Sequence, residues 1–455
     1  MGGADRISEL HDTLLTHILS YLPTKEVVRT CLLSKRWRNV WASVPVLDFD
    51  FADFLSDDIF SPGKNVTVQT ECHNNFVRFV DAVLQQARQL DRFRLVWLCQ
   101  VNYYWYYELP LTRWIPLVLQ KRPRVLSIYV QSRPVSVDVP DLAFTCSSLE
   151  EMKLRVDYAL FNILNPVSVC LPHLRKLNLG YLTIEAGYMN KLLLGCPNLG
   201  ELELYACVLN FSQISGGNLK SLVISGCYYE SAELWVSAPS LQYLEVAVMS
   251  CQTAGFVFEN MSSLVKACVC FLTVDYLEWK FSDIETNILN GLFGVENLDV
   301  VLYGSWAKYM LEHALESCPF FENLKAAHVE SFEGYLYGCI EMIDRLVQHA
   351  PILEDLTFHC YKDKSDEIEL LMELRKVVGD HRNCRSVESM QGHSYGSLDE
   401  LERLSLEYWR IFDKVVWVFE ENEEEDEHLE AWVEEEAGED VEADLEEEDK
   451  QDVVQ

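Results

Sequence analysis

A six-residue pattern of apolar positions, Leu-x-x-Leu-x-Leu, recurs through the middle of the chain. It is clearest from Leu174 to Leu179 and from Leu199 to Leu204. Further copies begin at residues 219 and 241, and looser copies begin at residues 125, 149, 264, 295, 321 and 353. Because alternate residues of a strand share one face, the fourth and sixth positions predict a short strand with one buried side.

A single short strand cannot bury its apolar face alone, so the copies are expected to stack side by side into a parallel sheet. The ten starts are about 25 residues apart on average, within the range of leucine-rich repeats. Proline stops helices, and five prolines stand two residues before a copy, where each can end a helix that precedes the strand. These are Pro172, Pro197, Pro239, Pro319 and Pro351.

The repeats predict an α/β fold, a leucine-rich-repeat solenoid over residues 46–363 with a curved parallel sheet and helices on its convex side. Residues 189–196 read as one of these helices, with Leu192 and Leu193 facing inward. Two weaker copies, at Val44 and Phe93, extend the array towards the N-terminus.

The first 45 residues follow a different pattern, which predicts three short helices. Asp12 can cap a helix with an i, i+4, i+8 apolar stripe, and Pro23 ends it. Thr24 can begin a second helix, and Ser34 can cap a third. This segment has more large apolar residues than so small a core can bury, which predicts a surface for a protein partner.

The sequence of this segment resembles an F-box. The resemblance is carried by Leu22-Pro23, by Val28-Arg29-Thr30 and above all by the string LSKRWRNVW at residues 33–41. Followed by leucine-rich repeats, it resembles the plant F-box/leucine-rich-repeat proteins, with a weak likeness to their FBD module over residues 329–358. F-boxes usually have Leu-Pro where this chain has Leu10-His11.

The resemblance implies the substrate-recognition subunit of a Skp–cullin–F-box ubiquitin ligase. The F-box, residues 1–45, would bind a Skp-family adaptor and through it a cullin, while the repeats would bind an unknown substrate protein. The protein itself would perform no chemistry and would work in the cytoplasm, the nucleus or both. The residues expected at the adaptor surface or in the core behind it are Leu10, Leu14, Ile18, Leu22, Pro23, Val28, Leu32, Trp37 and Trp41.

On the open face of the sheet, the fifth position of each copy points outward, and the signs of charge there are mixed. The nine outward residues are Lys153, Asn178, Glu203, Val223, Glu245, Cys268, Asp299, Lys325 and Thr357. Aromatic and mixed polar groups supply anchors in protein interfaces, so Tyr205, Tyr243 and Lys266 are the candidate substrate-binding residues.

The five consecutive aromatic residues 103–107 cannot all face one core, because neighbours in a strand alternate sides. They either pack on the F-box or an adjacent repeat, or form a protein-binding patch. Residues 364–419 predict a helical cap on the end of the solenoid. Residues 420–455 hold 20 acidic residues and one lysine, too charged to fold alone, which predicts a disordered acidic tail.

The net charge of −35 argues against binding by phosphate neutralisation, so no nucleic acid is expected. No run of 18 apolar residues occurs, so we expect no membrane span. The 15 cysteines show no zinc spacing and are expected to be buried thiols. We find no phosphate-binding loop, zinc-protease or hydrolase motif, so we expect neither an enzyme nor a cofactor.

Two other functions stay open. His11 could leave the F-box unable to recruit a ligase, which would make the protein an interaction scaffold. Alternatively, the repeats could enclose a small molecule and act as its receptor.

Overall fold

The computed structural model describes residues 7, 10–55, 65–98, 109–131, 140–157, 163–164, 166–229, 233–249, 255–272, 287–303, 307–316, 318, 320–331, 336–360 and 386–390. All of them belong to a compact unit formed by residues 1–392. The predictions for residues 103–107, for the acidic tail and for all of the helical cap except residues 386–390 lie outside the described residues.

The N-terminal segment begins with two short helices, α1 (Asp12–Leu19) and α2 (Thr24–Arg29). His11, rather than Asp12, is the N-cap of α1, so the prediction that Asp12 caps this helix is wrong. The predicted third helix is replaced by separate 3₁₀ turns, η2 (Trp37–Asn39) and η3 (Trp41–Ser43), which follow η1 (Thr30–Leu32). These tight turns still direct both tryptophans into the core.

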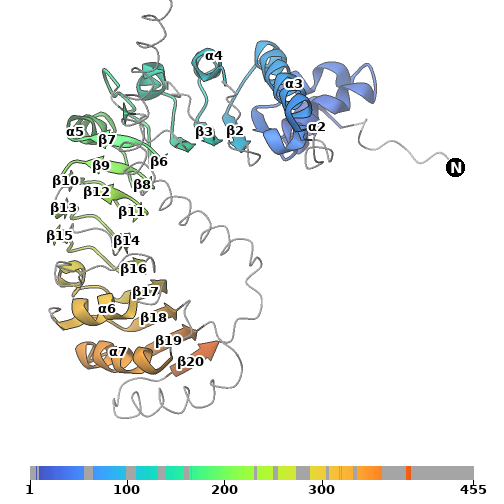
Figure 1. Cartoon of the computed structure of the whole chain (residues 1–455). Coiled ribbons are helices and arrows are strands. Elements are labelled where there is room, and N and C mark those ends of the chain that lie inside the picture. The colour runs from blue at the N-terminus through green and yellow to red at the C-terminus, as the bar shows by residue number, and fades with distance from the viewer. Residues whose placement is uncertain are drawn as a thin grey trace, which may run out of the picture. The chain divides into compact units, whose positions relative to one another are not determined.

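Thirteen parallel strands then form one long sheet in which almost every neighbour is also the next copy of the repeat. This arrangement confirms the predicted α/β solenoid (Figure 1). In sheet order, the strands are β1 (Val46–Asp50), β2 (Arg92–Leu98), β3 (Val125–Gln131), β4 (Glu151–Asp157), β6 (Lys176–Gly180), β8 (Glu201–Tyr205), β11 (Ser221–Ser225), β14 (Tyr243–Met249), β16 (Lys266–Leu272), β17 (Asn297–Tyr303), β18 (Ala326–Ser331), β19 (Asp355–Cys360) and β20 (Ser386–Met390).

A second layer covers one side of this sheet (Figure 1). Its helices are α3 (Asn65–Gln86), α4 (Leu111–Gln120), α5 (Ala186–Gly195), α6 (Ala307–Glu316) and α7 (Leu336–His349), with the 3₁₀ turns η4 (Phe51–Phe54), η6 (Asp141–Thr145) and η8 (Asn287–Gly291). Two small parallel sheets complete it: β5 (Ile163–Leu164), β7 (Thr183–Glu185), β9 (Val208–Asn210) and β12 (Tyr228–Tyr229) form one, and β10 (Gln213–Ser215), β13 (Glu233–Ser237) and β15 (Gly255–Glu259) form the other. The repeats that begin at residues 199, 219 and 241 are only 20 to 23 residues long, and short strands replace the helix there.

The register of the long sheet corrects three of the predicted repeat starts. Leu126 and Phe93 lie level with Met152, which is the fourth position of its copy, so these copies begin at residues 123 and 90 rather than 125 and 93. Ala327 lies level with Leu298, so that copy begins at Leu324 rather than Phe321. The errors have one cause, since each of these stretches has extra buried apolar residues that fit the template in a second frame.

The corrected register also changes which side chains face outward on β18. His328, not Lys325, is level with Asp299 and Thr357 in the outward row. Lys325 instead lies just before the strand, where its Nζ is 3.0 Å from Glu296 Oε2.

The sheet continues past residue 363, where the sequence predicts the end of the solenoid. Strand β20 pairs in parallel with β19 and lies within the segment predicted as a helical cap. One more strand is therefore added to the sheet before the described residues end.

The N-terminal helices and the repeats share one hydrophobic core, which runs from Leu15 to Phe358. The Thr24 hydroxyl accepts a hydrogen bond of 2.6 Å from the Asp48 amide of β1. The Arg88 amide, after α3, donates to the Ala42 carbonyl at 2.8 Å. The helical segment therefore begins the solenoid instead of being joined to it by a separate linker.

A repeated turn follows the strands of the central repeats. The eighth residue of three successive copies has a positive φ: 59° at Tyr181, 48° at Ala206 and 61° at Gly226. In two of these copies the next residue is a buried cysteine. The Cys207 sulfur lies 3.4 Å from the Tyr205 carbonyl oxygen, and the Cys227 sulfur lies 3.5 Å from the Leu204 carbonyl oxygen. Burial raises the pKa of Cys227 well above its ordinary value, so its thiol keeps the proton that this contact requires.

Gly226→Ala should lower the free energy of unfolding by about 1 kcal/mol, because a Cβ is strained in the left-handed region. The measurement is the urea midpoint of the full chain. Gly217→Ala is the control, since Gly217 has open space around it and no positive φ. Equal midpoints for the two variants would contradict this account of the turn.

Candidate functional site

The N-terminal segment exposes several large apolar side chains, which together we call the apolar surface. Leu14, Ile18 and Leu22 follow one another along and just beyond α1, and each exposes between 43% and 51% of its area. Leu32, in η1, is 84% exposed, and Pro23 is exposed as well. These five residues are among those predicted to shape the adaptor surface.

The other predicted adaptor residues lie deeper. Trp37 and Trp41 are only 5% and 8% exposed and belong to the core, where they support the apolar surface from behind. Leu10 and Val28 are half-buried at its edge. The opposite side of α1 is anchored by Leu15, which is fully buried.

Three further apolar residues of this segment are also exposed and were not among the predicted ones: Ile7, Tyr21 and Leu33. The Tyr21 ring lies edge-on to the His17 ring, with 5.4 Å between their centroids. Leu33 follows Leu32 directly and is 68% exposed. A consecutive leucine pair in a 3₁₀ turn has no helical periodicity, so the sequence offered no pattern that would assign both residues to the surface.

The start of α1 is held by polar contacts beside the apolar surface. His11 has φ −66° and ψ 147°, and its Nδ1 accepts a long hydrogen bond of 3.5 Å from the Thr13 amide. The Arg36 guanidinium donates to the Asp12 carboxylate at 2.8 Å and also to the Leu10 carbonyl oxygen. Arg36 therefore ties the turn that carries Trp37 to the first turn of α1.

The open face of the sheet carries a chain of polar side chains across β4, β6 and β8. Arg155, Gly180 and Tyr205 lie level on these three strands. The Arg155 guanidinium is 4.6 Å from the Tyr205 ring centroid, and its Nε donates to Asn178 Oδ1 at 2.9 Å. Asn178 in turn donates to Glu203. Arg155 can cross β6 because Gly180 has no side chain: a Cβ there would stand 2.8 Å from Arg155 Cγ.

Ion pairs continue on the same face. Lys176 Nζ is 2.6 Å from Glu201 Oε2, and this hydrogen bond raises the pKa of the lysine. Lys266 Nζ is 2.5 Å from Asp299 Oδ2 on the next strand. Many charges of the open face are thus already matched within the protein.

The structure brings two of the three predicted substrate-binding residues together. Tyr243 and Lys266 lie level on β14 and β16, and both are half-buried. The Tyr243 hydroxyl donates to Glu245 Oε2 at 2.6 Å, and burial together with this bond raises the pKa of the tyrosine. Tyr205 lies two strands away on β8, is 8% exposed and is covered by Arg155, so it offers little surface to a partner.

Metal-binding and membrane-spanning features were sought in the described part of the chain. No group of three or more His, Cys, Asp or Glu side chains converges there in a way that could hold a metal ion. None of the described helices has both the length and the apolar character needed to cross a membrane.

Comparison with known proteins agrees with the fold. The family model described as "F-box domain" matches residues 7–49, and the model described as "FBD-associated F-box protein At5g56370, LRR repeats" matches residues 111–257. FBD-associated F-box protein At4g13985 of Arabidopsis thaliana is 30% identical to the chain over 77% of this chain and 76% of its own length. F-box/LRR-repeat protein At3g58930 of the same plant is 27% identical over 86% and 82% of the two chains.

The chain is therefore a plant F-box protein with leucine-rich repeats. It belongs to the family of F-box/LRR proteins that includes the FBD-associated members.

Gly180→Ala should displace Arg155 from Tyr205 and Asn178 and lower the free energy of unfolding by about 1 kcal/mol. Urea denaturation measures this loss, and the same substitution in an Arg155→Ala background should cost much less. Gly200→Ala is the control, since a Cβ there would meet the nearest atom at 3.8 Å. If Gly180→Ala lowers the free energy of unfolding just as much in the Arg155→Ala background, the glycine is needed by strand β6 itself and not by Arg155.

Proposed function

We propose that the protein is the substrate-recognition subunit of a Skp–cullin–F-box ubiquitin ligase. The observation that carries the proposal is the apolar surface of the F-box segment, where Leu14, Ile18, Leu22, Leu32 and Leu33 are all exposed. Several large apolar side chains exposed within one short segment are typical of a protein-interaction site. The F-box match over residues 7–49 supports a Skp-family adaptor, and through it a cullin, as the partner.

In this proposal the repeats bind the substrate protein on the open face of the sheet. Tyr243 and Lys266 supply an aromatic and a cationic group at adjacent positions, which can anchor a partner. The protein performs no chemistry and needs no cofactor, and other subunits of the ligase transfer ubiquitin. Neither nucleic acid nor a membrane takes part, and the complex works in the cytoplasm, the nucleus or both.

Leu32→Asp should weaken adaptor binding by about 2 kcal/mol, roughly 30-fold in Kd. The leucine would be buried by the adaptor in the complex, and the substitution puts a desolvated charge in its place. Calorimetry with a purified Skp-type adaptor measures the effect. Leu194→Asp is a matched control, since Leu194 lies on α5 outside the F-box and is also 84% exposed. Folding should be unchanged in both variants, because neither side chain belongs to the core.

If the wild-type chain fails to bind the adaptor, the proposal is wrong and an interaction scaffold remains. If Leu32→Asp and Leu194→Asp weaken binding equally, the apolar surface is not the adaptor site.

His11→Pro should raise adaptor affinity slightly. The φ of −66° at His11 already suits proline, so the substitution removes freedom from the unfolded chain and gains about 0.4–1 kcal/mol in stability. The substitution removes the long contact of the imidazole to the Thr13 amide and its 3.1 Å hydrogen bond with the Thr13 hydroxyl. Thermal denaturation and calorimetry check both effects, and weaker binding of the variant would show that the imidazole itself contacts the adaptor.

A further inference from the structure

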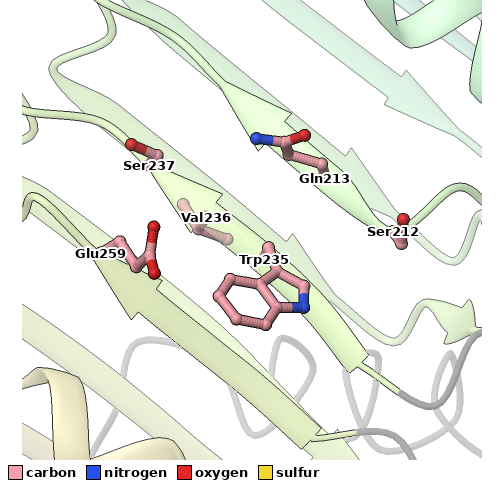
Figure 2. A pocket seen from close by; sticks show the side chains of 6 residues that line it. All are labelled: Ser212, Gln213, Trp235, Val236, Ser237 and Glu259. Atoms are coloured by element: carbon pink, nitrogen blue, oxygen red, sulfur yellow. The ribbon is translucent and has the colours of Figure 1, made fainter.

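A small hollow lies in the second layer, on the three-stranded sheet formed by β10, β13 and β15 (Figure 2). It has a volume of about 280 Å³ and is lined by Ser212, Gln213, Trp235, Val236, Ser237 and Glu259. This volume lies just below the 300–1,000 Å³ of typical ligand pockets, so it suits one side chain of a partner better than a whole cofactor.

The hollow exists because short strands replace helices in this part of the solenoid. Alternate residues of the three strands face inward, and Ile214, Leu234 and Phe256 are buried. Trp235, on the middle strand, faces outward and is 39% exposed. A large aromatic side chain is thus left uncovered in a region where, in neighbouring repeats, helices form the layer.

The indole of Trp235 is held in place from one side. Its Nε1 donates a hydrogen bond of 3.1 Å to Glu233 Oε2 on the same strand. This bond uses the polar edge of the ring, so what remains for a ligand is the negative π face. Gln213 lies level with Trp235 on β10, and its amide nitrogen donates to the Ser215 hydroxyl at 2.8 Å.

The chemistry of the hollow favours a cation. Glu259 lies on β15 level with Ser237, two residues along from Trp235 and its partner Val257, and Figure 2 shows its carboxylate and the indole on neighbouring strands. None of the residues of β10, β13 and β15 is lysine or arginine, and Lys220 is the only such residue between positions 208 and 265. The remaining lining groups, serine hydroxyls and the Gln213 carbonyl, can accept hydrogen bonds.

We infer that this hollow binds an arginine side chain of a partner protein, with the guanidinium stacked on Trp235 and paired with Glu259. Arginine fits better than lysine because its planar group stacks on aromatic faces while its N–H groups still donate to a carboxylate. The site lies in the layer opposite the open face of the sheet, so a partner bound here leaves both that face and the apolar surface of the F-box accessible. The inference does not rest on the proposed ligase function.

The test uses the full chain with ¹⁵N-labelled tryptophan and the peptide acetyl-Gly-Ser-Arg-Ser-Gly-amide. The indole signal of Trp235, assigned by its loss in Trp235→Leu, should shift saturably with the peptide. The same peptide with citrulline, which keeps the shape of arginine without its charge, should not shift it. Glu259→Gln should weaken binding of the arginine peptide about two- to fivefold, in line with an exposed charge contact.

Glu322→Gln is the matched control, because it removes the same charge at another exposed position of the described chain. Equal shifts with the citrulline peptide, or equal weakening by Glu259→Gln and Glu322→Gln, would overturn the inference. So would a Trp235 signal that does not move. Adaptor binding by Trp235→Leu is measured in parallel and should be unchanged, so that the outcome for this hollow and the outcome for the proposed function can be told apart.

Discussion

The structure depends on the burial of one side of each short strand against its neighbours. From β1 to β19, the strands of the long sheet each have only a few inward apolar residues, far too few to form a core alone. Stacked in register, these residues form the continuous row in which Leu177, Leu202 and Leu222 lie level and are almost fully buried. Burial of about 25 cal/mol per Å² of apolar area then accumulates along the array, and every outward position is placed by the same register.

Most of the fold follows from the sequence because this constraint places apolar residues at a regular spacing along the chain. The repeat, the parallel sheet and the helical N-terminal segment were all predicted. The exact frame was lost where one extra buried apolar residue, Val130 late in β3 or Phe321 ahead of β18, lets a copy that begins at Val125 or Phe321 fit equally well. Only the pairing of a strand with its neighbour decides between the two frames, and that pairing is seen in the folded structure and not in the sequence.

The candidate sites were harder to predict because they depend on exposure rather than on period. The F-box motif names Leu32 and Trp37 together, yet one is 84% exposed and the other 5%. Which of them is exposed is decided by two separate 3₁₀ turns, η1 with Leu32 and η2 with Trp37. Tyr205 looked like an anchor by its type, but Gly180 allows Arg155 to reach across and cover it. No sequence motif corresponds to the hollow beside Trp235.

The shared core of the F-box and the first repeats limits how the two parts can be exchanged between proteins. A cut after residue 45 would separate Thr24 from its partner amide on Asp48 and expose Leu47 and Phe49, which are almost completely buried. The F-box of this chain is thus a separate module in the sequence, but in the structure it shares its core with the first repeats. A force or a local unfolding event that loosens β1 would reach Trp41 and α1 as well, so the F-box and the repeats are coupled through solid packing rather than through a hinge.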